Sequence, residues 1–127
     1  MDKNTLLIKL SESPRTDFGR VAFAKQPEAQ QVFSAVWASE SEVNNGGFRS
    51  YLTGSEADTA AFAPKALRIV GATKCAAIVD RALQIGPSGD ISEVDDEFMA
   101  YPDNLTELLF AYVASHPEVF GEIDNIP

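Results

Sequence analysis

The fold of this chain is decided at residues 41–52, SEVNNGGFRSYL. Two asparagines and two glycines occupy positions 44–47, and two large aromatic residues, Phe48 and Tyr51, follow at once. Asparagine and glycine tolerate the left-handed backbone that closes a helix. We therefore predict that one helix ends at residues 44–47. Phe48, Tyr51 and Leu52, at i, i+3 and i+4, are expected to open a short second helix and to anchor it in the core.

The two glycines could also cradle an anion if they opened a helix. However, no strand pattern precedes them, no Gly-Lys-Ser/Thr follows them, and the Gly-x-Gly-x-x-Gly pattern of nucleotide sites is absent. We interpret them as a structural corner that lets two backbone segments approach closely.

A helix is predicted on the N-terminal side of this corner. Pro27 suits the first position of a helix, and an apolar stripe follows it at helical spacing. The stripe consists of Ala29, Val32, Phe33, Val36 and Trp37. This helix is expected to run to about Val43.

Two helical pieces are predicted directly after the corner. Ser55 followed by Asp58 is a variant of the capping box that opens helices. Pro64 would split this segment, because a proline inside a helix costs about 3 kcal/mol. The second piece ends at Gly71 and is expected to turn three apolar residues inward, Leu67, Ile69 and Val70.

Two further helix starts are predicted from capping residues. Thr73 is a candidate cap for a helix over 74–86. The small-residue face of that helix consists of Ala76, Ala77, Val79, Ala82 and Leu83. Ser92 with Asp95 repeats the capping signature and opens a helix that Pro102 interrupts.

Residues 103–116, DNLTELLFAYVASH, form the strongest amphipathic segment, and Pro117 stops it. Its apolar stripe is Leu105, Leu108, Leu109, Tyr112 and Val113. The chain thus predicts an all-α fold of six or seven helices in a single compact domain over 1–127. Residues 27–121 form its helical core, and residues 1–26 could begin with a short helix or a strand.

The charge of the chain is negative and unevenly distributed. A formal net charge of −9 disfavours nucleic acids and anionic membranes as direct partners, because both repel a negative surface. Residues 1–81 carry 10 basic and 9 acidic side chains, whereas residues 82–127 carry 10 acidic side chains and no Lys or Arg. These ten are Asp90, Glu93, Asp95, Asp96, Glu97, Asp103, Glu107, Glu118, Glu122 and Asp124.

These acids have two interpretations. Glu93 with Glu97, and Asp103 with Glu107, have i, i+4 spacing, at which like charges destabilise a helix by about 0.2–0.5 kcal/mol per pair. A basic partner would compensate, and such rows can approximate the spacing of DNA phosphates. Equally, they could form a solvated face that the helix dipole and solubility favour. The candidate partner-binding face comprises Asp90, Glu93, Asp95, Asp96, Glu97, Asp103, Glu107, Glu118 and Glu122.

Residues 42–48, EVNNGGF, with Tyr51 after them and ALRIVGATKCAAIVDRAL at 66–83, resemble a bacterial family long classified as a domain of unknown function. The family signature is Glu-Val-x-Asn-Gly-Gly-Phe-x-x-Tyr, followed by a helix that ends in Ile-Gly-Ala. This chain has Val-Gly-Ala at 70–72. The resemblance covers roughly residues 25–120.

The family includes a small acidic DNA mimic, a dimer whose carboxylates imitate duplex phosphates at the DNA-binding face of a transcription factor. The resemblance therefore implies an all-α fold, a basic DNA-binding protein such as a transcription factor as partner, and a homodimer as one oligomeric state. The residues that it carries over mark the fold rather than a site: Asn45, Gly46, Gly47, Phe48 and Tyr51.

No catalytic constellation stands out in the sequence. His116 lies at a predicted helix end, where an imidazolium suits the dipole. Cys75 lies in an apolar run and is expected to be a buried small hydrophobic residue. Glu40 and Glu42 could join the acids at 95–97 around a metal, but the Glu-x-x-His pairs of a di-metal bundle are absent. We predict no enzyme activity, no cofactor and no metal.

The leading hypothesis is a cytoplasmic, non-catalytic protein that presents an acidic helical face, mainly residues 90–124, to a basic protein surface. The cytoplasmic expectation follows from the lack of a signal peptide pattern and of an apolar run near the roughly 20 residues that span a bilayer. An immunity or antitoxin-like inhibitor of a basic nuclease is an alternative. A small-molecule-binding or hydrolytic domain, with a pocket around Trp37, Phe48 and Tyr51, is an alternative of a different class.

Overall fold

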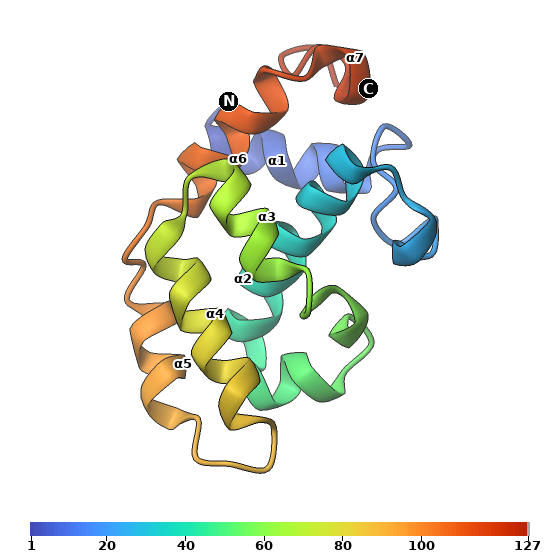
Figure 1. Cartoon of the computed structure of the whole chain (residues 1–127). Coiled ribbons are helices and arrows are strands. Elements are labelled where there is room, and N and C mark those ends of the chain that lie inside the picture. Colours follow the sequence, from blue (N-terminus) through green and yellow to red (C-terminus); the bar gives the residue numbers. More distant parts are fainter. Residues whose placement is uncertain (127) are drawn as a thin grey trace.

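The computed structural model describes residues 1–126, which form seven α-helices and two short 3₁₀ helices without a strand (Figure 1). The all-α prediction is confirmed. Pro127, the last residue of the predicted domain, lies outside the described residues. The α-helices are α1 (Lys3–Glu12), α2 (Glu28–Thr53), α3 (Ala63–Val70), α4 (Thr73–Ile85), α5 (Ser92–Met99), α6 (Leu105–Ala114) and α7 (Pro117–Phe120). The 3₁₀ helices are η1 (Phe23–Lys25) and η2 (Ala57–Thr59).

Helix α2 is the centre of the fold. It contacts α3, α5, α6 and both 3₁₀ helices, and Figure 1 shows it running through the middle of the molecule. Its predicted stripe points inward, since Val32, Phe33 and Val36 are buried and Ala29 and Trp37 are half-buried. Each large apolar side chain that is fully buried stabilises the fold by about 1.5–3 kcal/mol. The largest of these are Tyr51, Phe33, Phe48, Phe98 and Phe120.

The predicted corner is present at Gly47, the last of the four residues 44–47 at which a helix end was predicted. Helix α2 continues through these residues and kinks at Gly47, where φ is 78° and ψ is 177°. The Asn44 amide donates to the carbonyl oxygen of Glu40 at 2.7 Å and so stays on the helix surface. The helix was predicted to run to about Val43, but it continues to Gly46, because only Gly47 leaves the helical conformation.

The start of α3 differs from the capping-box prediction. Ser55 and Asp58 make no capping hydrogen bond, and the residues after Ser55 form η2 instead. Helix α3 begins at Ala63 with Pro64 in its first turn. The predicted division at Pro64 is therefore present: Pro64 lies in the first turn of the second piece, where no N–H is needed from it, and that piece ends before Gly71.

The starts of α4 and α5 also lack the predicted local caps. Thr73 and Ser92 are the first helical residues, and the positions before them are occupied by Ala72 and Ile91, which have no capping side chain. The N-terminus of α4 is capped instead by a carboxylate from another part of the chain.

Three residues that were predicted to face inward are exposed. Ile69 is 40% exposed and Leu83 is 36% exposed, and Ala77 is exposed as well. Ile69 lies two positions after Leu67, which is about 200° around a helix of 3.6 residues per turn. Leu67 and Val70, three positions apart, share the buried side.

The first residues of the chain form a helix, α1, rather than a strand, which settles the alternative left open for residues 1–26. In α1, Asp2 caps the N-terminus by accepting from the Thr5 backbone N–H at 2.7 Å, and Leu7 and Leu10 are buried.

Within the part of the chain that the structure describes, none of the helices is long and apolar enough to cross a membrane.

The predicted stripe of α6 is confirmed in its spacing. Leu105, Leu109 and Val113 are buried, while Leu108 and Tyr112 are half-buried. The helix begins after Asn104, whose side chain accepts from the Glu107 backbone N–H at 3.1 Å.

Candidate protein-interaction surface

Asp95 lies where α5 passes the corner of α2. Its Oδ1 accepts a hydrogen bond from the Phe48 backbone N–H at 2.7 Å, and Phe48 begins the second half of α2 after the kink. A Cβ on Gly47 would lie 2.7 Å from Oδ2 of Asp95, so the glycine leaves room for the carboxylate. Asp95 therefore caps a helical segment of another element, where the helix dipole favours a negative charge.

The other residues of the fold motif surround this contact. Phe48 and Tyr51 have no exposed surface. The Phe48 ring packs edge-on against Phe98 of α5, with centroids 5.5 Å apart. The Tyr51 hydroxyl lies 2.6 Å from the Thr59 hydroxyl of η2, and burial raises the pKa of Tyr51. Asn45, by contrast, is exposed.

Asp103 makes a second contact of the same kind. Its Oδ2 accepts from the Cys75 backbone N–H at 2.8 Å, in the first turn of α4. Asp103 precedes α6, so it does not share a helix face with Glu107 as its i, i+4 spacing suggested. Cys75 is buried, as predicted, and burial raises the pKa of its thiol to about 11.

Arg81 of α4 neutralises the i, i+4 pair of α5. Its Nη1 donates to Oε1 of Glu97 at 2.8 Å. Its Nη2 lies 2.7 Å from Oε2 of Glu97 and 3.7 Å from Oε1 of Glu93 as an ion pair. The hydrogen bond from Arg81 lowers the pKa of Glu97. Arg81 therefore compensates part of the repulsion between the two acids inside the chain, so their spacing does not by itself require a basic partner.

Two more acids of the candidate face have partners. Glu107 pairs with Lys3 of α1, with Oε2 and Nζ 2.6 Å apart at an exposed position. Asp90 accepts from the Ser92 hydroxyl at 2.8 Å and from its N–H at 3.3 Å, and these bonds lower the pKa of Asp90.

Three acids of the candidate face stay exposed without such partners. Asp96, Glu118 and Glu122 are exposed, and their carboxylates make no ion pair or hydrogen bond with residues 1–126. The nine acids therefore differ in role: some stabilise the backbone, some are neutralised, and these three point to solvent.

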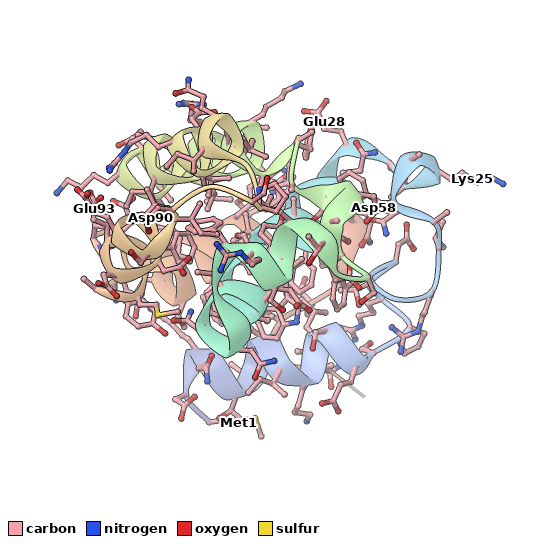
Figure 2. The ribbon with its side chains drawn as sticks, turned by 90° about the horizontal axis from the view of Figure 1, so that it is seen from below. Met1, Lys25, Glu28, Asp58, Asp90 and Glu93 are labelled. Carbon is pink, nitrogen blue, oxygen red and sulfur yellow. The ribbon has the colours of Figure 1, made fainter. Side chains whose placement is uncertain are left out.

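A second acidic group was missed by the sequence analysis. Burial raises the pKa of Glu56, and the negative charges of Asp58 and Glu42 raise it further. Figure 2 shows Asp58 on the opposite side of that view from Asp90 and Glu93. This group consists of Glu42 of α2 with Glu56 and Asp58 at η2. The sequence did not indicate it, because residues 1–81 are nearly balanced in charge and no local pattern shows that α2 and η2 are neighbours.

Arg49 and Arg15 donate hydrogen bonds to backbone carbonyl oxygens and form no ion pair with an acid within residues 1–126. Arg49 donates to the carbonyl oxygens of Pro87 and Gly89, at 2.7 and 2.9 Å, and Arg15 donates to those of Glu122 and Asn125, both at 2.7 Å. Of the 19 acidic side chains, all within the described residues, four lie in ion pairs and fifteen do not. Most of the carboxylates in the structure therefore have no ion pair that would neutralise their charge.

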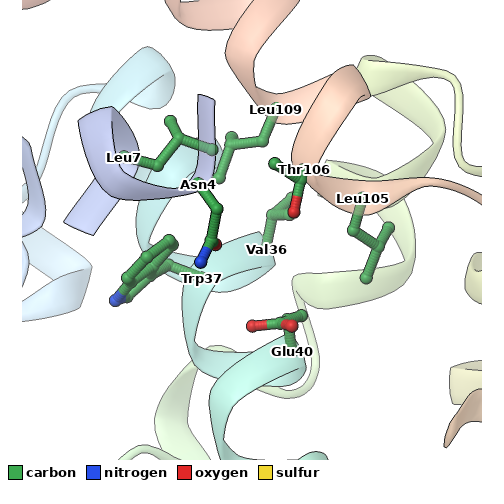
Figure 3. A pocket seen from close by; sticks show the side chains of 8 residues that line it. All are labelled: Asn4, Leu7, Val36, Trp37, Glu40, Leu105, Thr106 and Leu109. Atoms are coloured by element: carbon green, nitrogen blue, oxygen red, sulfur yellow. The ribbon is translucent and has the colours of Figure 1, made fainter. Parts of the chain in front are cut away.

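The pocket predicted around Trp37, Phe48 and Tyr51 does not form, because Phe48 and Tyr51 are fully buried. Trp37 instead lines a small hollow between α1, α2 and α6, of about 10 Å³, together with Glu40 (Figure 3). That volume holds about one water molecule. A wider pocket of about 420 Å³ adjoins it at Glu40 and is lined by Asn4, Glu40, Tyr101, Asn104 and Thr106. Burial raises the pKa of Glu40.

His116 and the candidate metal ligands form no centre. The His116 Nδ1 lies 2.7 Å from the Tyr112 carbonyl oxygen, which only accepts, so Nδ1 carries a proton. This contact places the ring at the end of α6, where the sequence placed it. Within residues 1–126, no group of three or more His, Cys, Asp or Glu side chains is arranged to hold a metal.

These features define a small, acidic, all-α domain whose glycine corner is fastened by an internal carboxylate. A family model described as DMP19-like protein matches residues 24–116, which include this corner. The chain belongs to the DMP19-like protein family. No curated protein and no solved structure matches it closely enough to add a named relative.

Proposed function

We propose that this chain is a non-catalytic interaction protein that presents carboxylates to a basic protein and occupies the surface with which that partner binds DNA. The observation that carries the proposal is the charge surplus, because fifteen of the 19 acids have no ion pair. Membership of the DMP19-like family supports it, since the resemblance implies DNA mimicry.

The available part of the acidic face is narrower than the nine predicted residues. Asp95 and Asp103 hold backbone N–H groups, and withdrawing either from its contact would leave that donor without a partner. We place the contact on the three exposed acids without partners and on two further exposed acids. They belong to two groups, because Figure 1 shows α5 and α7 at opposite ends of the molecule. In order along the chain they are Asp90, Glu93, Asp96, Glu118 and Glu122.

Such a surface would act mainly on the rate and salt dependence of association. Complementary charge steers two proteins together, and this attraction weakens once salt screens it beyond about 10 Å at 0.1 M. Binding should therefore weaken steeply as salt rises, as it does for DNA-binding proteins that contact phosphates.

Affinity capture from a lysate of the source cell, eluted in a salt gradient and read by mass spectrometry, tests the proposal. A DNA-binding protein that elutes at moderate salt is the expected result, and a nuclease there would favour the inhibitor hypothesis. The proposal would be contradicted if the captured protein eluted independently of the salt concentration, or if no specific protein were captured.

A competition experiment then tests mimicry directly. The captured protein is bound to a fluorescent duplex, and the chain is added while anisotropy is recorded. The chain should release the duplex. Simultaneous binding of both would show that the acidic surface docks elsewhere on the partner.

A further inference from the structure

Glu40 is a half-buried carboxylate without a cationic partner. It projects from α2 into the pocket between α1, α2 and α6, and the ion pairs of residues 1–126 do not include it. Withdrawing a carboxylate from water costs free energy unless it is paired. The position therefore favours an incoming positive group.

Further acceptors surround the same opening. Figure 3 shows Asn4 of α1, Glu40 of α2 and Thr106 of α6 converging on it from three helices. Neither the Asn4 amide nor the Thr106 hydroxyl has a hydrogen-bond partner in the part of the chain that the structure describes. A carboxylate, an amide oxygen and a hydroxyl can together accept the three N–H bonds of one ammonium group.

The wall of the pocket is held in a strained conformation. Tyr101 has a φ of 53°, the only positive φ of a non-glycine residue among residues 1–126. Its side chain is largely exposed, at 54%, so burial does not explain the conformation. Burial raises the pKa of Glu40, and the nearby Tyr101 hydroxyl offsets part of that rise. Strain of this kind is typically retained at binding sites.

The size of the site restricts its ligand. The open part, about 420 Å³, falls within the usual range of ligand pockets. The hollow beside Trp37, which Asn4, Glu40 and Thr106 also line, has room for little more than a water-sized group. An ammonium head fits this shape, and its alkyl stem would lie towards the open side past Tyr101.

We propose that this pocket binds a primary alkylammonium group, with Glu40 as its counter-charge and Asn4 and Thr106 as further acceptors. The group could be carried by a free amine or by a lysine of another protein. The inference goes beyond the proposed function and does not depend on it, because small amines test it without any protein partner.

Trp37 reports on the site, because it is the single tryptophan of the chain and lines the adjoining hollow. The probes are n-butylammonium and Nα-acetyl-lysine methylamide, with 1-butanol as the uncharged control. Both ammonium probes should change the Trp37 emission with saturation, and butanol should not. Equal affinity of the two would indicate recognition of the ammonium alone, whereas tighter binding of the capped lysine would indicate a protein-borne ligand.

Two variants make the test specific. Glu40→Gln should weaken both ammonium probes at least about tenfold, because it removes the charge and keeps the shape. Glu42→Gln, two residues along the same helix and outside the pocket, should bind as the unchanged chain does. Thr106→Val should weaken binding of the ammonium probes less than Glu40→Gln does. It replaces Glu40→Gln as the test if the melting curve of Glu40→Gln shows that this variant is not properly folded. No saturable response, or equal affinity in Glu40→Gln, would overturn the proposal.

Discussion

The Asp95 carboxylate accepts the backbone N–H of Phe48 at 2.7 Å across 47 positions of sequence. This bond joins α5 to the second half of α2. It explains in one contact why a glycine precedes the aromatic residue and why an acid lies opposite it. An acid that looked like part of a binding face thereby serves the fold.

Asp95→Ala should lower the free energy of unfolding by about 1–3 kcal/mol, because it leaves the Phe48 N–H without its charged acceptor. Urea denaturation followed by circular dichroism measures this. Asp96→Ala is the matched control, since Asp96 is the next residue and is exposed, and it should stay within about 0.5 kcal/mol. Equal effects of the two would show that the Asp95 contact adds little.

Gly47→Ala should destabilise more than Gly19→Ala. Both positions have a positive φ, which favours glycine, and Gly47 combines it with a ψ of 177°, a region restricted essentially to glycine. A Cβ at Gly47 also meets Asp95, whereas one at Gly19 has nothing within 4 Å. Removing the Asp95 side chain should therefore reduce the penalty at Gly47 but leave its backbone part. Additive effects in the double variant would contradict the proposed clash.

Arg81→Gln should reduce the melting temperature at neutral pH but not in acid. Arg81 lowers the pKa of Glu97 below its ordinary 4.5. The pair therefore contributes stability above about pH 4.5, and this is lost as pH falls through the lower pKa of the folded state. Melting curves from pH 7 to pH 3 should show the two proteins converging. Lys74→Gln, on the same helix and without an ion pair, should show no such convergence.

Cys75 should not react with Ellman's reagent at pH 8 while the chain is folded. Its side chain has no exposed surface, and its pKa of about 11 leaves about one thiolate in a thousand at that pH. Denaturant should release the full reactivity. Rapid labelling in native buffer would instead indicate that the start of α4 opens readily.

A triple charge reversal tests the acidic surface without disturbing the fold. Asp96→Lys, Glu118→Lys and Glu122→Lys change exposed acids without partners, so the chain should stay folded while capture of its partner is lost. A control with the same change of net charge reverses three exposed acids elsewhere, Glu12, Glu28 and Asp58. That control should retain most of the capture. Equal loss in both variants would indicate that net charge, rather than these particular positions, determines capture.

The helices themselves could be predicted because their pattern is local. The apolar stripes of α2 and α6 repeat within four residues, and the buried sets that they predicted are largely those observed. The corner at Gly47 was also recognisable, since a glycine pair between helical segments has few other uses. Ile69 and Leu83 were predicted to belong to the inward-facing side of their helices, but they are exposed. At the edge of an apolar stripe, the spacing alone does not decide whether a residue is buried.

The candidate face was predicted only as a list of charges. The sequence determined that residues 82–127 contain acids and no Lys or Arg. It did not show that Arg81 reaches two of these acids from α4, or that Lys3 reaches Glu107 from α1. Those pairs depend on which helices are neighbours, and helical periodicity carries no information about that.

By itself, then, the sequence determined where the chain is helical, where it bends and how much negative charge it carries. Only the tertiary structure decided what the charges do. Ser55, Thr73 and Ser92 were predicted to cap helices through contacts within three residues. The carboxylates that stabilise Phe48 and Cys75 come from 47 and 28 positions away. The physical reason is that a backbone N–H donates to any well-placed acceptor. The packing of α5 against α2 and α4, and of α6 against α2 and α3, places these two carboxylates.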